Sequence, residues 1–327
     1  MQTILLQNST DKLSLKEGQL IVSNNGIISG QYPICATEII QVIGNAQITT
    51  QAIKECLKEG VRINYFNVYG KYLGRVEPGY PKNIRRRLEQ YQLYLNHERR
   101  LHWARNLIAA KIQGEIIELR KLYEQGSEFP LKRLRRELKS YQKKCIEAES
   151  IKSLLGIEGM AARTYYKVFP YVLPSDVTWH GRTYHPAEDG INELMSFVYG
   201  CTATQIRLNI EAFALDPHCG FLHEPGYGGG DLTYDLLEVV RAVFCDHIVL
   251  QAIRKNKVIR SFAAQHNVAQ LPDNVRDSIS QRLKKSMSIT YSTQKISPGE
   301  QIKKLVEMVA FNLANGLPQF SKFLPER

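Results

Sequence analysis

The sequence has few cysteines, no long apolar run and no basic leader. Its 327 residues include six cysteines, and no two of them form a Cys-x-x-Cys pair. Scattered cysteines favour reduced, mostly buried thiols over a disulfide framework or a zinc site. No stretch of about 18 apolar residues is present, so a membrane span is not expected. The N-terminus lacks the basic segment of a secretory signal peptide, and we therefore expect a cytoplasmic protein.

Negative charge is also scarce, and the positive excess is local. The formal net charge is +11. Residues 82–144 contain 17 Lys/Arg and only 7 Asp/Glu, which accounts for ten of these charges. Such a segment is either a solvated basic face or a site for a polyanion, and its concentration favours the second. The predicted DNA contacts in it are Arg133, Arg135, Arg136, Lys143 and Lys144.

The chain divides into a β-rich part and a helical part. We predict an α+β protein with a β-rich, sandwich-like domain at 1–76, a linker and the start of the first long helix at 77–90, and a helical domain at 91–327. Short apolar runs predict strands at 19–23, 39–43 and 61–66, with one helix from a Thr49/Thr50 cap to near Gly60. Helical periodicity is expected over 82–122, 131–148, 189–214, 231–254 and 298–313, with loops at 167–182 and 226–230.

Three separate segments carry residues that suit a hard divalent ion. They contain Glu158, His223, and the pair Asp235 and Glu238. Residues three apart share one face of a helix, so the pair can address one centre. Oxygen and nitrogen ligands without a thiolate favour Mg²⁺ or Mn²⁺ over Zn²⁺. This set predicts metal-dependent chemistry on a nucleic-acid backbone.

Each of these residues also has a simpler explanation. Glu158 suits a helix start, where the macrodipole favours a carboxylate. A lone His223 at the end of an apolar run is typical of a core histidine. Asp235 and Glu238 would fit a solvated helix face, although their apolar neighbours predict burial and therefore partners. The glycine cluster 226–230 is not a P-loop, because no Gly-Lys-Ser/Thr follows it.

The order of several motifs is more specific than any one of them. Gly-Ile-Glu-Gly-x-Ala-Ala-Arg at 156–163 is followed by Trp-His-Gly-Arg at 179–182, Asp-Gly-Ile-Asn at 189–192, Gly-Phe-Leu-His at 220–223 and Asp-Leu-Thr-Tyr-Asp-Leu-Leu-Glu at 231–238. Residues 42–49 and 70–75 extend the match into the β-rich part. Together they resemble the CRISPR-associated integrase, the catalytic subunit that inserts spacers into CRISPR arrays.

The resemblance implies roles for individual residues. It implies that Glu158, His223 and Glu238 are catalytic metal ligands, with Asp235 beside them and Tyr199 near the site. Removing one carboxylate is then expected to relieve repulsion in the metal-free protein. Arg163, as a DNA contact, and Asn192 are given supporting roles. Relatives often carry Arg or Lys after the histidine, whereas this chain has the 226–230 glycine cluster.

The implied reaction is transesterification, in which the 3′-hydroxyl ends of a short DNA duplex attack the boundaries of the CRISPR repeat. The implied partners are DNA, a second copy of the chain bound through the β-rich domain, and a small ferredoxin-like adaptation subunit that bridges two dimers. The implied setting is the prokaryotic cytoplasm.

Three alternatives remain at this stage. A non-catalytic DNA-binding protein would need the basic stretch but not the acidic and imidazole residues. A structure-specific, metal-dependent endonuclease would use water in place of the hydroxyl nucleophile. A transposon-encoded integrase would usually add a C-terminal DNA-binding extension.

Overall fold

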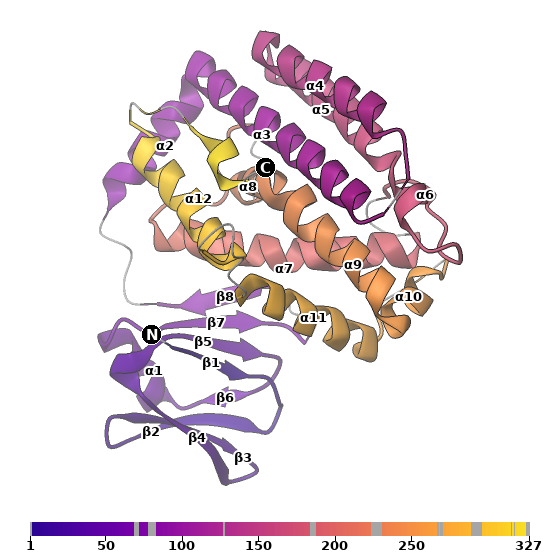
Figure 1. Ribbon diagram of the computed structural model, residues 1–327. Helices are drawn as coiled ribbons and strands as arrows, with labels where there is room; N and C mark the ends of the chain where they lie inside the picture. Colours follow the sequence, from indigo (N-terminus) through magenta and orange to yellow (C-terminus); the bar gives the residue numbers. More distant parts are fainter. Residues whose placement is uncertain are drawn as a thin grey trace. The chain divides into compact units, whose positions relative to one another are not determined.

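Two units, residues 1–82 and 83–327, make up the chain in a computed structural model (Figure 1). The structure describes residues 2–68, 72–77, 83–126, 128–183, 188–223, 231–266, 268, 271–288, 296–314, 316 and 318–324. The first unit is rich in strands and the second is mostly helical, which confirms the predicted α+β class.

Two four-stranded sheets form the first unit. One sheet has the order β1 (Gln2–Leu6), β5 (Thr37–Ile43), β7 (Arg62–Phe66), β8 (Tyr72–Val76). Its first three strands are parallel, and β8 is antiparallel to β7. The other sheet has the order β4 (Ile27–Pro33), β3 (Gln19–Asn24), β2 (Asp11–Lys16), β6 (Gln47–Ile48). Buried side chains from both sheets, such as Leu13, Leu20, Ile40 and Ile63, share one core.

Local signals explain the turns of this unit. Asn25 and Gly26 have φ values of 49° and 81°, and they join β3 to β4. Positive φ at both positions matches the twist of a two-residue hairpin. Helix α1 (Thr50–Lys58) begins after Thr49, whose side chain accepts a hydrogen bond from the backbone N–H of Ala52 at 3.3 Å. The predicted cap is therefore confirmed.

Twelve helical elements build the second unit in its described part, together with one short 3-10 turn, η3. They are α2 (Ile84–Leu95), α3 (His97–Glu124), α4 (Leu131–Glu147), α5 (Ile151–Tyr166), α6 (Phe169–Val172), α7 (Gly190–Ala212), α8 (Asp231–Val240), the π-helical η2 (Arg241–Asp246), α9 (His247–Lys255), α10 (Lys257–Ala263), α11 (Asp273–Ser288) and α12 (Pro298–Asn312). The turn η3 spans Phe320–Phe323, and η1 (Ile34–Ala36) lies in the first unit.

Helix α3 is the central element of the helical unit. It packs against α4, α5, α8 and η2. Figure 1 shows α3 as the long helix beside α4 and α5. Its Trp103 ring lies 4.8 Å from Phe221 and 6.1 Å from Phe320, centroid to centroid. Because α3 is buried on most sides, it brings residues from distant parts of the sequence together.

Several helix boundaries differ from the sequence prediction. The continuous periodicity over 82–122 is broken at Asn96, which ends α2 and whose Oδ1 accepts from the backbone N–H of Arg99 at 3.0 Å to cap α3. The predicted helix over 231–254 is divided by η2. Helices α5, α10 and α11 were not predicted individually, and the predicted loop at 167–182 contains α6. In the described part of the chain, we find no helix with the length and apolarity needed to cross a membrane.

Candidate active site

Two of the predicted carboxylates converge on a single cation, the ammonium of Lys111. Nζ of Lys111, on α3, contacts Oε1 of Glu158 on α5 and lies 2.5 Å from Oε2 of Glu238 on α8. The side chain of Lys111 is only 6% exposed, while those of Glu158 and Glu238 are 23% and 13% exposed. The three helices α3, α5 and α8 therefore build one place where two carboxylates hold a positive charge.

The position of Glu158 rules out its simpler explanation. Helix α5 begins after Ser150, which forms a reciprocal capping pair with Ser153. Glu158 lies two turns further along, outside the first turn, where the helix dipole acts most strongly. The interpretation of Glu158 as a helix-start carboxylate is therefore wrong.

Arg241 completes the charge balance around Glu238. Its Nη1 donates to Oε1 of Glu238 at 2.7 Å, and its Nη2 donates to the hydroxyl of Tyr166 at 3.2 Å. Burial by itself would raise the pKa of Glu238, but Arg241 and Lys111 outweigh it and lower that pKa to about 2. Arg241 is also the first residue of the π-helical segment η2, a distortion often found at functional sites.

Asp235 fixes the second predicted ligand, His223. Its carboxylate is fully buried, and Oδ2 accepts backbone N–H groups of Phe221 and Leu222 at 2.5 and 2.9 Å. Oδ1 lies 2.6 Å from Nδ1 of His223. With Nδ1 engaged by a carboxylate, Nε2 is the nitrogen through which this imidazole would bind a metal. Arg100 supports the segment by donating to the carbonyl of Phe221 at 2.9 Å.

Two further simple explanations are wrong. The side chain of His223 is 42% exposed, so it is not a buried core histidine. Asp235 and Glu238 do not form a solvated helix face, because their side chains are 0% and 13% exposed. The expectation that buried carboxylates have partners is met at both residues.

The residue types suit Mg²⁺ or Mn²⁺, since two carboxylates converge on one cation and Asp235, on the same helix as Glu238, orients the imidazole of His223. Among the described residues, however, no three His, Cys, Asp or Glu side chains are grouped closely enough to hold a metal ion. The assignment of Glu158, His223 and Glu238 as ligands stays a prediction.

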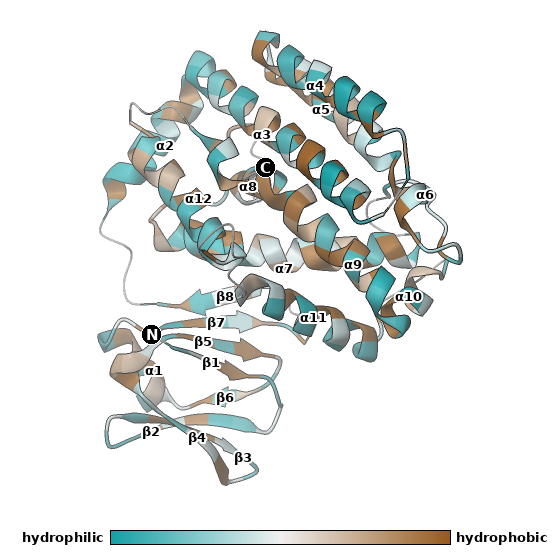
Figure 2. Cartoon of the chain, viewed as in Figure 1, coloured by the Kyte–Doolittle hydropathy of each residue, from teal (hydrophilic) through white to brown (hydrophobic). Residues whose placement is uncertain are grey.

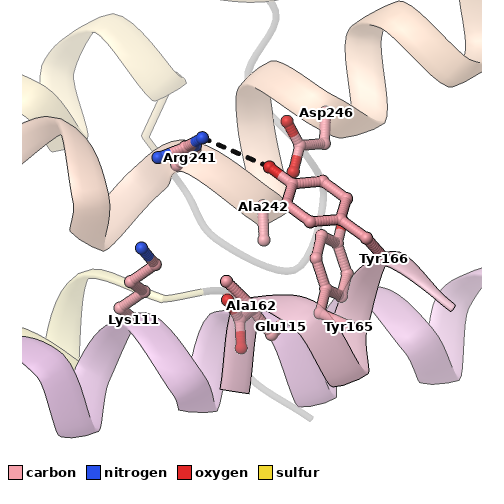
Figure 3. A pocket seen from close by; sticks show the side chains of 8 residues that line it. All are labelled: Lys111, Glu115, Ala162, Tyr165, Tyr166, Arg241, Ala242 and Asp246. Carbon is pink, nitrogen blue, oxygen red and sulfur yellow. Dashed lines mark hydrogen bonds between the residues drawn. The ribbon is translucent and has the colours of Figure 1, made fainter. Parts of the chain in front are cut away.

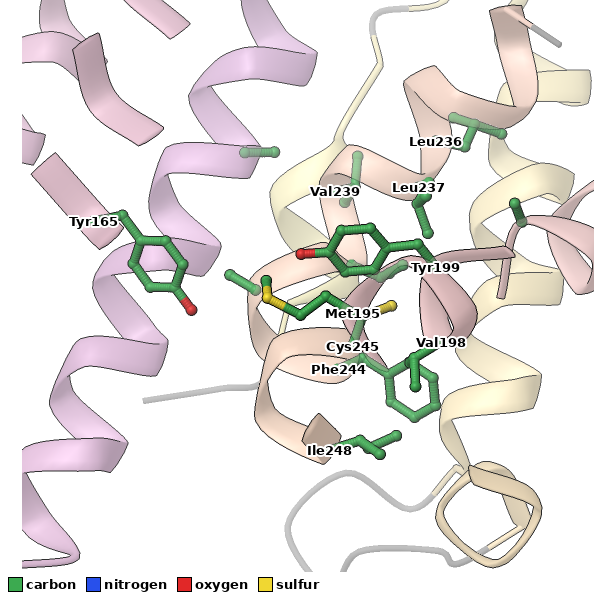
Figure 4. Close-up of a cluster of buried hydrophobic side chains, with 14 of the residues drawn as sticks. Tyr165, Met195, Val198, Tyr199, Leu236, Leu237, Val239, Phe244, Cys245 and Ile248 are labelled. Atoms are coloured by element: carbon green, nitrogen blue, oxygen red, sulfur yellow. The ribbon is translucent and has the colours of Figure 1, made fainter. Parts of the chain in front are cut away.

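Tyr199 lies behind this cluster, between two guanidinium groups. Its ring centroid is 4.6 Å from Cζ of Arg241 and 5.3 Å from Cζ of Arg182, and its hydroxyl donates to Asp246. Figure 4 shows Tyr199 among buried apolar side chains of α7 and α8. Arg182 is held in turn by Asn192, at 2.7 Å. Tyr199 therefore packs against Arg241, which contacts Glu238, and Asn192 holds Arg182 on the other side of the ring.

Replacing Tyr199 with phenylalanine is expected to reduce the strand joining that the resemblance implies by about two- to tenfold. The ring and its contacts with Arg241 and Arg182 would remain, and only the hydrogen bond to Asp246 would be lost. Tyr199→Ala should be much more harmful, because it also removes buried ring area. Initial rates of joining for both variants measure the difference, and equal losses would contradict a role through ring packing.

Glu115 is a buried carboxyl that the sequence analysis missed. It lines a cavity of about 10 Å³ with Lys111, Tyr165, Arg241 and Asp246, which has room for about one water molecule (Figure 3). Burial raises the pKa of Glu115 to about 8, an effect that Lys111 opposes and Glu158 and Glu238 reinforce. Its i, i+4 spacing from Lys111 was the available sequence signal.

Glu115→Gln is expected to flatten the pH dependence of stability in metal-free protein. Because the folded pKa is raised above the ordinary 4.5, the stability that Glu115 contributes is complete below pH 4.5 and is lost as the pH rises towards 8. The variant keeps a neutral side chain throughout, so it should gain melting temperature relative to wild type at pH 8 but not at pH 5. Thermal unfolding in chelator checks this, and a constant difference across that range would contradict it.

Helix α4 presents the exposed basic residues. Its apolar face buries Leu134, Leu138 and Cys145. The exposed side chains include Lys132, Arg133, Arg135, Arg136, Lys139, Lys143 and Lys144. Figure 2 shows this helix as largely hydrophilic. Arg133 also donates to Glu137 at 3.0 Å, an exposed pair that contributes little to stability. Arg163 is exposed on α5.

Other basic residues of 82–144 are engaged within the fold. Arg99 donates to the carbonyls of Leu313 and Ala314 at 2.7 and 2.8 Å. Arg105 donates to the carbonyl of Ala148 at 2.8 and 2.6 Å. The described basic residues of the segment thus include structural contacts on α3 and an exposed surface that lies mostly on α4, with Arg85 on α2 and Arg120 on α3 also exposed. The glycine cluster at 226–230 lies outside the described residues.

A helix rich in exposed basic residues packs against the helix that carries Glu158, an arrangement that suits a nucleic-acid enzyme, and comparison with known proteins gives the family. The model of the family described as CRISPR associated protein Cas1 matches residues 4–285. The chain belongs to the Cas1 family. A relative from Methanospirillum hungatei, named CRISPR-associated endonuclease Cas1 4, is 32% identical over 260 residues, which cover 79% of this chain and 72% of that protein.

Solved structures share the fold. A Cas1 protein from Thermotoga maritima superposes with a TM-score of 0.75 at 22% identity, covering 96% of this chain and 98% of that one. A structure described as a casposase bound to integration product gives 0.74 at 22% identity, covering 98% and 94%. A Cas6-RT-Cas1–Cas2 complex gives 0.74 at 18% identity, covering 99% of this chain and 36% of that one.

Proposed function

We propose that this chain is a metal-dependent DNA integrase of CRISPR adaptation, which joins the 3′-hydroxyl ends of short DNA duplexes to the CRISPR repeat by transesterification. The observation that carries the proposal is the convergence of Glu158 and Glu238 on one cation, with Glu238 on the same helix as Asp235, which holds His223. Family membership and the likeness to a casposase bound to integration product support it.

The residues of the chain have distinct tasks in this proposal. Glu158, Glu238 and Nε2 of His223 would hold Mg²⁺ or Mn²⁺, and Asp235 keeps the imidazole oriented. Bound Mg²⁺ or Mn²⁺ supplies charge stabilisation at the scissile phosphate and at the leaving oxygen. The basic residues of α4 anchor DNA through its phosphates, independently of sequence. Because one ester replaces another, positioning of the two DNA molecules is the main requirement.

We include partners in the proposal. Two DNA ends have to reach two active sites, so a homodimer through the β-rich unit and a small ferredoxin-like bridging subunit belong to the functional assembly. The Cas6-RT-Cas1–Cas2 complex among the similar structures supports a Cas partner. The DNA substrates place the activity in the prokaryotic cytoplasm.

A joining assay tests the proposed function. A labelled duplex is incubated with supercoiled plasmid that carries the repeat, with the chain, the bridging subunit and Mn²⁺ or Mg²⁺. We expect joined products from a duplex with 3′-hydroxyl ends and none from a duplex with 3′-dideoxy ends. Cut plasmid in equal amounts with both duplexes, without joining, would instead identify a structure-specific endonuclease, the second candidate that the curated name of the relative favours.

A further inference from the structure

The cluster at the candidate site is balanced in charge without any bound ion. Glu158 and Glu238 contribute two negative charges, and Lys111 and Arg241 contribute two positive charges. All four side chains are mostly shielded from water, with exposed fractions of 6% to 23%. A divalent cation added to these four groups would bring two further positive charges into a poorly solvated place, which is unfavourable.

Lys111 lies between the same two carboxylates that a metal ion would need. The contacts of its Nζ that the structure describes are Glu158 and Glu238. A metal ion and an ammonium that contacted the same pair of carboxylate oxygens would repel each other strongly, so metal binding at this position displaces the ammonium. Arg241 is held in place by three groups: Glu238, the hydroxyl of Tyr166 at 3.2 Å and the Tyr199 ring at 4.6 Å. The flexible lysine is therefore the group that moves.

A DNA phosphodiester supplies what the displaced ammonium lacks. Its negative charge offsets part of the charge of the metal and gives Lys111 a new anionic partner. We propose that Lys111 is an internal counter-ion, which occupies the cation position between Glu158 and Glu238 in the DNA-free protein and makes tight loading of the divalent ion depend on a DNA phosphate. This inference rests on the proposed function, because it takes the site to bind metal and DNA together.

The coupling is measurable as metal affinity, without any reaction. Mn²⁺ binding to the full chain is measured by isothermal titration calorimetry, with and without a duplex that ends in 3′-dideoxy nucleotides. For wild type we expect weak binding alone and binding at least about tenfold tighter with DNA, within the ~5- to 150-fold range of such couplings. Lys111→Met should bind Mn²⁺ about tenfold or more tighter than wild type without DNA and should respond less to DNA.

The matched control is Lys121→Met, in the last turn of the same helix, which should behave as wild type. Equal affinity of wild type and Lys111→Met for Mn²⁺ would overturn the inference while leaving the metal site and the integrase in place. Absence of Mn²⁺ binding in every variant, with and without DNA, would overturn the proposed function as well. If Lys111→Met does not fold, an unchanged wild-type affinity with and without DNA still overturns the inference.

Discussion

Replacing Glu158 with glutamine is expected to reduce strand joining by at least about a hundredfold, while DNA affinity measured in chelator, without a divalent ion, stays within about twofold of wild type. Glutamine keeps the size of the side chain but removes the charge that would hold a divalent ion in the proposed function. The α4 surface that we expect to bind DNA is formed by other side chains and is left intact. The measurement compares initial joining rates with duplex affinity from fluorescence anisotropy.

Two related variants and one control sharpen this result. His223→Ala and Glu238→Gln should lose joining to a similar degree. Glu149→Gln, an exposed glutamate before α5, should join DNA as wild type does. Joining at the wild-type rate by His223→Ala would show that the imidazole is not a ligand. A parallel loss of DNA affinity in all three site variants would mean that the cluster binds DNA rather than acting on it.

Glu238→Gln differs from the other variants in its effect on folding. The sequence suggested that removing a carboxylate relieves repulsion, but Glu238 is paired with Lys111 and Arg241. Glutamine would remove the negative charge that these two shielded cations share. We therefore expect a loss of roughly 1–3 kcal/mol in the free energy of unfolding. The repulsion that the sequence-based expectation assumed is not found at this residue, because its carboxylate is paired with cations from other parts of the fold.

Reversing the charge of Arg133, Arg135 and Arg136 together is expected to weaken duplex binding at least about tenfold and to flatten its salt dependence. Each phosphate contact that is lost removes about 0.9 from the slope of log affinity against log salt, so a change of about one to three is expected. All three side chains are exposed on α4, so the fold should be unaffected. Anisotropy titrations at several salt concentrations give both quantities.

The control for this experiment is a triple variant with the same change in net charge on helices other than α4. Lys284, Lys285 and Lys303 are exposed on α11 and α12, and their replacement by glutamate reduces long-range attraction by the same amount. A local contact surface on α4 predicts a clearly smaller effect for this control. Equal effects of the two triple variants would show that α4 is a solvated face and that only net charge matters.

Local signals in the sequence determined much of this protein. The division into a β-rich and a helical part, the Thr49 cap of α1 and the bounds of α4 and α12 follow from periodicity and capping, which depend on neighbouring residues. The ordered motifs indicated Glu158, His223, Asp235 and Glu238 as candidate site residues. These features could be predicted because each depends on residues that are close together in the sequence.

Only the tertiary structure decided how these residues are charged and paired. Lys111 and Arg100 belong to the basic segment by sequence, yet folding buries Lys111 against Glu158 and Glu238 and turns Arg100 onto the carbonyl of Phe221. Whether a lysine faces DNA or neutralises an acid depends on which distant helices pack around it. Pairing across α3, α5 and α8 is set by the shared core of the helical unit, and no local pattern along the chain contains it.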